Sequence, residues 1–358
     1  MSRPACATIH TDALQHNLAE VRRRAPSSRV MAVVKADGYG HGLERVAQAL
    51  AAADAFGVAS IADAERIRAT GSSKPIVLLS GFFEPEDLRL IRRLGLDTVV
   101  HDESQLEMLE ADPDPSPLRL WVKFDSGMHR LGFPLDKARA VVERVHALGR
   151  PGPAPVWMTH FARSDEFDAP ATAEQIRRFD AALAGIPGER SLSNSAAVLG
   201  WPQASRDWVR VGGALYGLSV VAGRSGADFG LQPAMSLSSR LIAINEVQAG
   251  EAVGYGGTWR APATTRLGIA AIGYGDGYPR HAPSGTPVLI HGRPARIAGR
   301  VSMDLLAIDL ADHPEARVGD AVLLWGPGLP VEAVAEAAGT IGYELTCGIT
   351  RRVRFIEA

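Results

Sequence analysis

The chain has little cysteine, almost no net charge and no long apolar run. It holds two cysteines, Cys6 and Cys347, in 358 residues, so a disulfide-stapled fold is not expected. Its 38 basic and 40 acidic side chains give a formal charge of −2, which offers no electrostatic footprint for nucleic acid or an anionic membrane. No stretch reaches the roughly 18 apolar residues of a membrane-spanning helix, and the first residues lack the apolar core of a secretory signal. We therefore expect a cytoplasmic protein with reduced thiols.

Several common catalytic motifs are also absent. The sequence contains no CxxC pair, no HExxH zinc motif, no P-loop and no GxSxG nucleophile motif, and we expect no metal site. Its hydrophobic content of 46% is ordinary for a globular protein. At roughly 100–200 residues per domain, the length indicates about two domains.

The first part of the chain alternates between helical and strand patterns. A first helix is predicted to be capped by Asp12 and to bury one apolar face formed by Leu14, Leu18 and Val21. Eight apolar runs follow, with amphipathic segments between most of them. Eight strand-then-helix units favour a closed (β/α)8 TIM barrel over the alternative, an open doubly wound sheet. The predicted strands are 29–38, 55–60, 75–81, 97–102, 119–127, 155–162, 190–195 and 207–213.

The rest of the chain has a different pattern. After about Ser225, short apolar stretches alternate with glycine and proline turns, which is typical of a mostly-β domain. One helix is predicted there, at Val331–Ala338. We predict a barrel domain at 11–225 and a β-rich C-terminal domain at 226–358, with 1–10 as a candidate addition to the second domain.

Polar side chains follow each predicted barrel strand. Active sites of such barrels lie at the C-terminal ends of the strands. Because side chains along a strand alternate between its faces, Lys35, Lys123 and His160 share a face with apolar residues two positions earlier. We therefore expect three strands to direct a cation or an imidazole into one cavity. The predicted ring of strand-end residues is Lys35, Ser60, Ser80, His101, Lys123, His160, Asn194 and Arg210.

Lys35 is the first candidate for chemistry. It follows the apolar run 32–34 and precedes Gly38 and Gly40. Apolar surroundings lower the pKa of an amine, and the neutral amine is a nucleophile. The glycines would let a ligand approach the backbone closely. A surface lysine at a strand end is the alternative explanation of the same pattern.

The ends of the last two predicted strands suit an anion. Asn194–Ser195 and Gly212–Gly213 stand where barrels often bind phosphate through backbone N–H groups, although ordinary turns explain them equally well. Arg210 ends the eighth strand and needs a partner if it is buried, for which His160 or a ligand is a candidate. By residue type alone, a structural role is favoured for His160.

Nine sequence motifs, in order, run through both parts of the chain. VVKADGYGHG at 33–42 resembles the pyridoxal-phosphate lysine motif of bacterial alanine racemases. That family combines a PLP-binding (β/α)8 barrel with a C-terminal β domain, as the pattern above also predicts. The other motifs are WVKFDSGMHRLGF (121–133), THFARSD (159–165), SNSAA (193–197), VRVGGALYG (209–217), VGYGGTW (253–259), IGYGDGYPR (272–280), GRVSMD (299–304) and IGYELTC (341–347).

The resemblance implies a cofactor and a mechanism. Lys35 would carry a Schiff base with pyridoxal 5′-phosphate, and Lys35 and Tyr255 would act as two bases on opposite faces of the substrate. Tyr255 and Met303 would come from the partner subunit of a homodimer with shared active sites. The implied activity is the interconversion of L-alanine and D-alanine, which supplies D-alanine for peptidoglycan.

The resemblance also implies which residues hold the cofactor. Arg210 would contact the pyridine nitrogen and would itself be supported by His160. The remaining cofactor-binding residues would be Tyr39, Asn194, Ser195, Gly212, Gly213 and Tyr343.

Further residues would serve the substrate. Arg130 would lie beside its carboxylate, and Met303 and Tyr255 would also contact it. Lys123 matches a position that is often carbamylated in the family. Tyr274 and Arg280 would lie at the entrance to the site.

Other functions remain open at this stage. One is a broader amino-acid racemase that acts on alanine and serine. Others are a decarboxylase or aldolase on the same barrel, an aldolase that forms a Schiff base without this cofactor, and a non-catalytic pyridoxal-phosphate carrier. Tyr255 within VGYGGTW favours a racemase, and carrier barrels lack the second domain.

Overall fold

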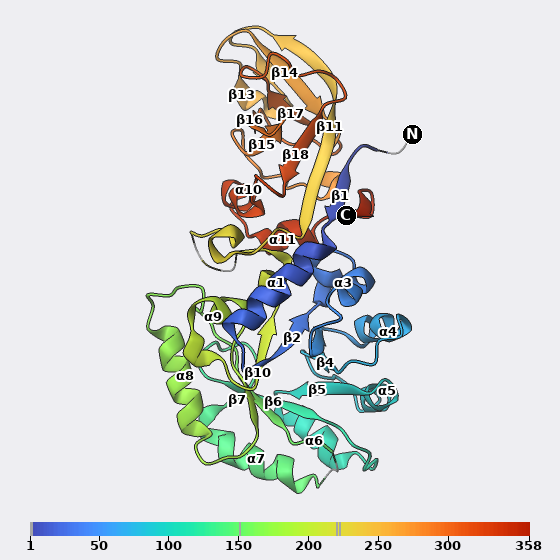
Figure 1. The fold of residues 1–358 in the computed structure, drawn as a ribbon, viewed down its shortest axis with the longest axis vertical. Coiled ribbons are helices and arrows are strands. Elements are labelled where there is room, and N and C mark those ends of the chain that lie inside the picture. Colours follow the sequence, from blue (N-terminus) through green and yellow to red (C-terminus); the bar gives the residue numbers. More distant parts are fainter. Residues whose placement is uncertain (1–2, 150–151, 220, 222) are drawn as a thin grey trace.

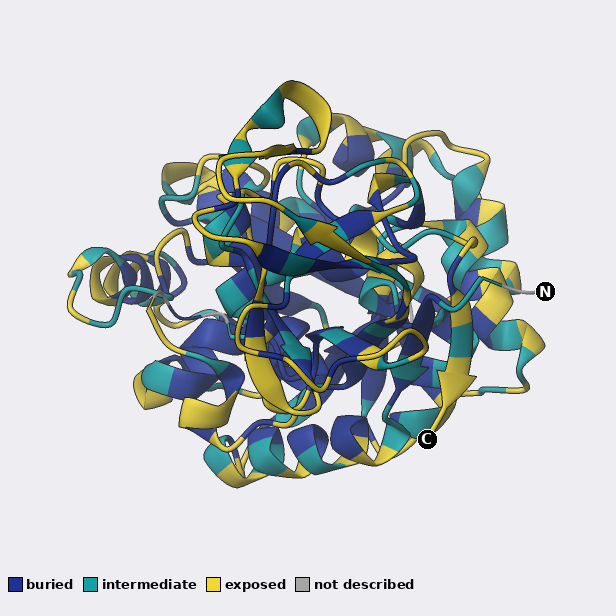
Figure 2. Ribbon diagram, turned by 90° about the horizontal axis from the view of Figure 1, so that it is seen from above, coloured by how far each residue is buried: buried dark blue, intermediate teal, exposed yellow. Residues whose placement is uncertain are grey.

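The computed structural model describes residues 3–149, 152–219, 221 and 223–358 and shows two bodies arranged along one long axis (Figure 1). One is a barrel surrounded by helices, and the other is built mainly from strands. Residues 1–2 of the segment 1–10 lie outside the described residues. Figure 2, seen along the long axis, shows buried residues gathered toward the middle of the view and exposed residues on the outer turns of the surrounding helices.

Eight parallel strands within the described residues form the barrel wall, and each overlaps one of the eight predicted strands. These strands alternate with helices along the chain, as the helical and strand periodicities indicate. The strands are β2 (Arg29–Val33), β3 (Ala55–Val58), β4 (Ile76–Leu78), β5 (Leu96–Val100), β6 (Leu120–Asp125), β8 (Val156–Met158), β9 (Glu189–Ser191) and β10 (Trp208–Val211).

The pairing of these strands closes the ring. Neighbours in the order β2-β3-β4-β5-β6-β8-β9-β10 pair in parallel, and β10 pairs with β2. The two-residue strand β7 (Phe133–Pro134) adds to β6 outside the ring. The predicted (β/α)8 fold is therefore confirmed, and the open doubly wound sheet is wrong.

Helices cover the outside of the barrel (Figure 1). The first, α1 (Thr11–Arg24), buries the predicted apolar face, but its N-cap is His10 and not Asp12. The helix has already begun at Thr11, so the Asp12 carboxylate lies in the first turn and accepts from the Ala13 N–H at 2.8 Å. The other barrel helices are α3 (Leu43–Ala49), α4 (Ile61–Ala69), α5 (Asp87–Arg93), α6 (Glu103–Ala111), α7 (Ala138–Ala147), α8 (Ala171–Ala182) and α9 (Ser195–Gly200).

The barrel interior is a packed core and not a pore. Met31, Trp121, Met158 and Trp208 come from four strands and belong to one buried cluster. The cluster is completed by Ala55, Val77, Val99 and Val156. Because these side chains fill the interior, residues on the same strand faces further along the chain are displaced to the mouth, which confirms the predicted alternation.

The second body is a sheet of mostly antiparallel strands, which confirms the predicted β-rich domain. Its strands within the described residues are β1 (Cys6–Ile9), β11 (Met235–Val247), β14 (Thr265–Ala270), β15 (Pro287–Ile290), β16 (Arg293–Ile297), β17 (Leu306–Asp309), β18 (Ala321–Trp325) and β19 (Arg354–Glu357). A separate hairpin pairs β12 (Ala252–Val253) with β13 (Trp259–Arg260).

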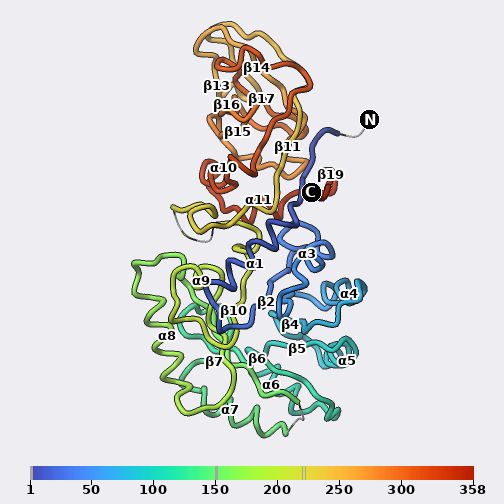
Figure 3. Tube along the Cα trace, viewed as in Figure 1, coloured from blue at the N-terminus to red at the C-terminus, as the bar shows by residue number. Residues whose placement is uncertain are grey.

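Strand order in this sheet brings the two chain ends together. β14 pairs with both β17 and β11, so six strands close on themselves. β1 then pairs antiparallel with β11 and parallel with β19. Figure 3 shows β19, the strand at the C-terminal end of the chain, near the junction of the two bodies.

Two helices lie near that junction (Figure 1). α10 (Val331–Ala338) has the bounds predicted from the sequence. α11 (Gly342–Cys347) was not predicted as a helix, because six residues with glycine at the first position give no clear periodicity. None of the helices in the described part of the chain combines the length and the apolarity needed to cross a bilayer.

Candidate active site

A cavity of about 1260 Å³ opens at the C-terminal ends of the barrel strands. Two members of the predicted ring do not line it. Ser60 caps α4 by accepting from the Asp63 N–H, and the His101 ring contacts the Ser80 carbonyl at 3.1 Å. The six that do line it are Lys35, Ser80, Lys123, His160, Asn194 and Arg210.

Positive charge accumulates in this cavity. Desolvation and then the charge of Arg130 lower the pKa of Lys35. Burial, followed by the charges of Arg210 and Arg130, lowers the pKa of Lys123 to about 8. Within the described residues, no carboxylate lies within ion-pair distance of Lys35, Lys123 or Arg210. Such a site favours neutral amines and anionic ligands.

Arg210 is held by main-chain oxygens from two neighbouring strand ends. It is 4% exposed, and it donates to the carbonyls of Ser191 at 2.8 Å and Thr159 at 2.6 Å. Its Nη2 also lies 3.2 Å from Nδ1 of His160. Burial and then the charge of Arg210 hold the pKa of His160 well below its ordinary value, so the imidazole is neutral and Nδ1 accepts. No partner for Nε of Arg210 occurs among the described residues.

Lys35 begins a turn with unusual backbone geometry. In α2 (Lys35–Tyr39) and at Gly40, the φ angles of residues 36–40 are positive, from 52° to 79°. Ala36, Asp37 and Tyr39 are not glycines, and each costs about 1–2 kcal/mol in this left-handed region. Backbone strain of this kind clusters at functional sites.

A helix start and a strand end meet at Ser195. Its Oγ accepts from the Gly212 N–H at 3.0 Å and the Ala214 N–H at 3.3 Å. Asn194 is the N-cap of α9, and its Oδ1 accepts from the Ala197 N–H at 3.0 Å. Asn194 therefore orders the helix start, and Ser195 joins it to the end of β10.

Two tyrosine hydroxyls approach the adjacent glycines. A Cβ on Gly212 would lie 2.3 Å from the Tyr39 hydroxyl, and one on Gly213 would lie 2.2 Å from the Tyr343 hydroxyl. Burial raises the pKa of Tyr39 to about 12 and raises that of Tyr343 further, so both hydroxyls keep their protons. Only glycine fits at either position, and the result is a cradle lined by hydroxyls and backbone.

Arg130 reaches the cavity from the loop after β6. Asp125, at the end of that strand, accepts from the N–H groups of Gly127, Met128 and His129 at 2.9, 2.9 and 3.1 Å. Asp125 thus orders the loop that carries Arg130. Asp125 shares a strand face with Lys123, two residues earlier, but it does not line the cavity.

The remaining predicted site residues lie on the β domain. Tyr255 is 66% exposed and Met303 is 52% exposed, and neither lines the cavity that holds Lys35. Tyr274 is also exposed, and the Arg280 guanidinium lies 5.9 Å from its ring centroid. A single chain therefore does not bring these four residues to Lys35.

Two family models cover nearly the whole chain. The model described as "Alanine racemase, N-terminal domain" matches residues 9–220, and the model described as "Alanine racemase, C-terminal domain" matches residues 234–357. The chain belongs to the alanine racemase family. The predictions of this family and of an isomerase are thereby confirmed.

Relatives in the alanine racemase family support this membership. A protein of Shewanella loihica named alanine racemase is 54% identical over 347 residues, 97% of each chain. The biosynthetic alanine racemase of Pseudomonas aeruginosa has a crystal structure with a TM-score of 0.96, 48% identity and 99% coverage of both chains. The alanine racemase of Bartonella henselae, described with covalently bound pyridoxal phosphate, has a TM-score of 0.90, 25% identity and 99% coverage of both chains.

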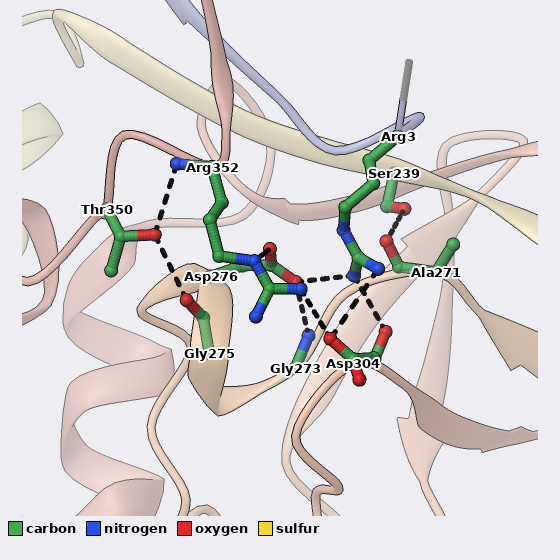
Figure 4. A network of polar contacts seen from close by, with 9 residues as sticks. All are labelled: Arg3, Ser239, Ala271, Gly273, Gly275, Asp276, Asp304, Thr350 and Arg352. Atoms are coloured by element: carbon green, nitrogen blue, oxygen red, sulfur yellow. Dashed lines mark hydrogen bonds and ion pairs between the residues drawn. The ribbon is translucent and has the colours of Figure 1, made fainter. Parts of the chain in front are cut away.

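A polar network behind the Tyr274 turn was not predicted from the sequence (Figure 4). The buried carboxylate of Asp276 accepts from Arg3 at 2.7 Å and from the Gly273 N–H at 3.0 Å, and Arg352 lies 3.3 Å away. The network ties both chain ends to the turn η6 (Tyr274–Asp276). No local pattern could reveal it, since Arg3 and Asp276 are 273 positions apart.

The described residues contain no candidate metal site. Across those ranges, no three His, Cys, Asp or Glu side chains gather closely enough to hold an ion.

Proposed function

We propose that this chain interconverts L-alanine and D-alanine, with pyridoxal 5′-phosphate bound at Lys35. The observation that carries this proposal is the cavity in which Lys35 lies together with Lys123, Arg130, Arg210 and the glycine cradle. The names of the relatives and the covalently bound cofactor of the Bartonella henselae protein support it.

The residues of the cavity fit this cofactor. The cradle at Gly212 and Gly213, together with hydroxyls of Ser195, Tyr39 and Tyr343, supplies the donors that a phosphate needs, in space that a Cβ would fill. Lys35 would hold the aldehyde.

Arg210 would face the pyridine nitrogen. Its Nη atoms are engaged by main-chain oxygens and by the neutral His160, which leaves Nε to donate. An arginine stays protonated, so it donates a hydrogen bond without giving up its proton.

Proton transfer at Cα needs a group on each face of the substrate. The bound cofactor withdraws electrons from Cα and makes its hydrogen acidic. Lys35, whose pKa is lowered in the cavity, takes up or returns the proton on one face. We assign the other face to Tyr255 of the partner subunit.

A head-to-tail homodimer would supply that second group. Tyr255 and Met303 are exposed and lie outside the cavity of their own chain, so each can serve only a neighbouring cavity. Leu305 is exposed on the same domain, as apolar side chains at an interface are before assembly. Tyr274 and Arg280 would then lie at the entrance to the partner's site.

The substrate is proposed to be a small amino acid. Arg130 offers a cation for its carboxylate. Tyr343, with Tyr255 and Met303 of the partner subunit, would crowd its side chain and favour a methyl group. Pockets discriminate one hydroxyl by only about 1–3 kcal/mol, so serine should react more slowly than alanine. Equal kcat/KM values for the two would establish the broader amino-acid racemase instead.

Lys123 is proposed to be carbamylated. With a pKa of about 8, a substantial fraction of its amine is neutral near neutral pH and can attack carbon dioxide, forming a C–N bond and releasing a proton. The carbamate would place an anion close to the charges of Arg210 and Arg130, which help to lower the pKa of this lysine. NMR of protein equilibrated with ¹³C-bicarbonate should show a carbamate carbon whose signal grows from pH 7 to 9 and is missing in Lys123→Ala; a signal unchanged in that variant would refute the assignment.

The proposed function is tested by Lys35→Ala. This variant should lose both the visible absorbance of the bound cofactor and D-alanine formation, while Lys137→Ala, at an exposed position, should keep both. Colour without any D-alanine formation in the unaltered protein would indicate a carrier. Release of carbon dioxide from L-alanine in deuterated buffer would indicate a decarboxylase.

The cellular role follows from the product. We propose that the D-alanine supplies peptidoglycan synthesis in the cytoplasm. The C-terminal domain match at 234–357 supports a racemase over a single-domain carrier barrel.

A further inference from the structure

The turn after Lys35 cannot hold its left-handed shape by local hydrogen bonds alone. The Gly40 N–H donates to the Ala36 carbonyl at 3.0 Å, and the Gly38 N–H donates to the Val34 carbonyl, which precedes the turn, at 2.9 Å. Three of its five residues are not glycines and prefer other backbone angles. Contacts from outside the turn must therefore stabilise it.

His41 supplies the first of these contacts. Its Nδ1 lies 2.9 Å from the Tyr39 carbonyl and 3.1 Å from the Gly38 carbonyl, and its backbone N–H donates to Gly38 at 3.0 Å. Because both neighbours of Nδ1 are acceptors, Nδ1 carries the proton. His41 thus joins two carbonyls that the left-handed turn directs to the same side.

The other nitrogen of His41 shows that packing does not explain this residue. Nε2 is buried and has no hydrogen-bond partner among the described residues. Burial lowers the pKa of His41 to about 4, so the ring is neutral and Nε2 is an unpaired acceptor. An aliphatic side chain would avoid that unfavourable burial, and it could not make the Nδ1 contacts that help to offset it.

Tyr216 supplies the second set of contacts. It is fully buried, its ring stacks on Tyr39 with centroids 4.7 Å apart, and the His41 ring lies tilted against it at the same centroid distance. Its hydroxyl donates to the Val33 carbonyl at 3.1 Å, two residues before Lys35. One side chain therefore contacts the chain on both sides of Lys35.

The turn also packs closely against α11, at Gly40. A Cβ on Gly40 would lie 2.0 Å from the Thr346 carbonyl oxygen and 3.1 Å from Cα of Cys347. Movement of Gly40 toward α11 would therefore displace the helix that carries Tyr343.

We propose that His41 and Tyr216 are positioning residues that clamp the turn at 36–40, and so fix the directions of the Lys35 amine and the Tyr39 hydroxyl. The clamp itself is read from the contacts, while its effect on the cofactor rests on the proposed function of Lys35. The two parts have separate readouts.

The clamp is tested by hydrogen exchange in the full-length protein. His41→Asn keeps an N–H donor close to the position of Nδ1, whereas His41→Leu removes it at similar volume. Exchange of the amides at 36–42 should be about tenfold or more faster in His41→Leu and close to unaltered in His41→Asn. The matched control is His313→Leu, which removes a buried histidine bonded to a backbone carbonyl of the β domain and should leave 36–42 unaltered.

The same measurement in a Lys35→Ala background separates the clamp from the cofactor. The acceleration caused by His41→Leu should persist there, where no bond to Lys35 can form. Unaltered exchange at 36–42 in His41→Leu, or equal acceleration in His41→Asn and His41→Leu, would overturn the clamp in either background.

The effect on the site is read from the cofactor and from the kinetics. His41→Leu should release pyridoxal 5′-phosphate about tenfold faster and lower kcat more than it raises KM, and His41→Asn should restore both. Tyr216→Phe, which loses only the hydrogen bond to the Val33 carbonyl, should also release the cofactor faster and lower kcat, but by smaller factors than His41→Leu. Wild-type release and kcat in His41→Leu, alongside accelerated exchange, would refute the effect on Lys35 and leave the clamp.

Discussion

The side chains to which we assign the chemistry are buried in the barrel and exposed in the β domain. At the barrel mouth, Arg210 is 4% exposed and Lys123 is 6% exposed, and their pKa values are lowered by burial. On the β domain, Tyr255 is 66% exposed and Met303 is 52% exposed. The barrel half of the site is thus formed within one chain, while the β-domain half is exposed, and we propose that a second chain covers it. The following experiments test this difference.

Mixing two inactive variants tests it most directly. Lys35→Ala and Tyr255→Phe should each lower kcat/KM by about 100- to 10,000-fold, because each removes one acid–base group. If the groups come from different chains, unfolding and refolding the two variants together should restore about a quarter of wild-type activity, since half of the dimers are mixed and one of their two sites is intact.

The control for this experiment is Lys35→Ala refolded with a Lys35→Ala/Tyr255→Phe double variant, which can form no intact site. No recovery in the first mixture, with mixed dimers demonstrated by mass, would show that both groups act within one chain.

Acid should destabilise the barrel mouth through His41. Its pKa is about 4 in the folded state and about 6.5 when unfolded, so the unfolded chain binds more protons between these values. The free energy of unfolding should therefore fall by about 3 kcal/mol from this group as the pH drops from about 6.5 to about 4. Urea titrations at pH 7, 5.5 and 4.5 should show a smaller fall in the free energy of unfolding for His41→Asn than for the wild-type protein. An equal fall in the two proteins would show that His41 does not cause the acid destabilisation.

Gly213→Ala should have the smallest effect of the three. Its Cβ would meet the Tyr343 hydroxyl at 2.2 Å, and cofactor affinity should fall about tenfold, or about 1.4 kcal/mol. Gly268→Ala in the β domain meets only leucine side-chain atoms, at 2.9 Å and beyond, and should lower stability without weakening cofactor binding. Equal cofactor affinity in Gly213→Ala and wild type would show that the cradle does not hold the phosphate.

Periodic patterns were sufficient for the fold. Alternation along β6 and β8 places Lys123 and His160 two residues after the interior residues Trp121 and Met158. The helix at Val331–Ala338 was also predictable, because its apolar residues recur at helical spacing. In each case the periodic pattern lies within one strand or one helix, so a short stretch of sequence is enough to reveal it.

Features that depend on distant partners were not predictable. His10 stands at the N-cap position of α1 in place of Asp12, and its backbone N–H donates to the distant Ala234 carbonyl at 2.9 Å. Asp276 meets Arg3 only because β1 joins the sheet of the C-terminal domain. Neither contact leaves a trace in neighbouring residues.

The order of hydrophobic and polar residues by itself determined that this chain forms a barrel and a β domain, and its motifs identified the family. Only the tertiary structure decided which side chains share a cavity, that residues 36–40 turn left-handed, and that Tyr255 is exposed and outside the cavity that holds Lys35. The physical reason is range: periodicity reports which face of one element is buried, whereas desolvation, charge coupling and backbone strain arise from atoms that only the folded chain brings together.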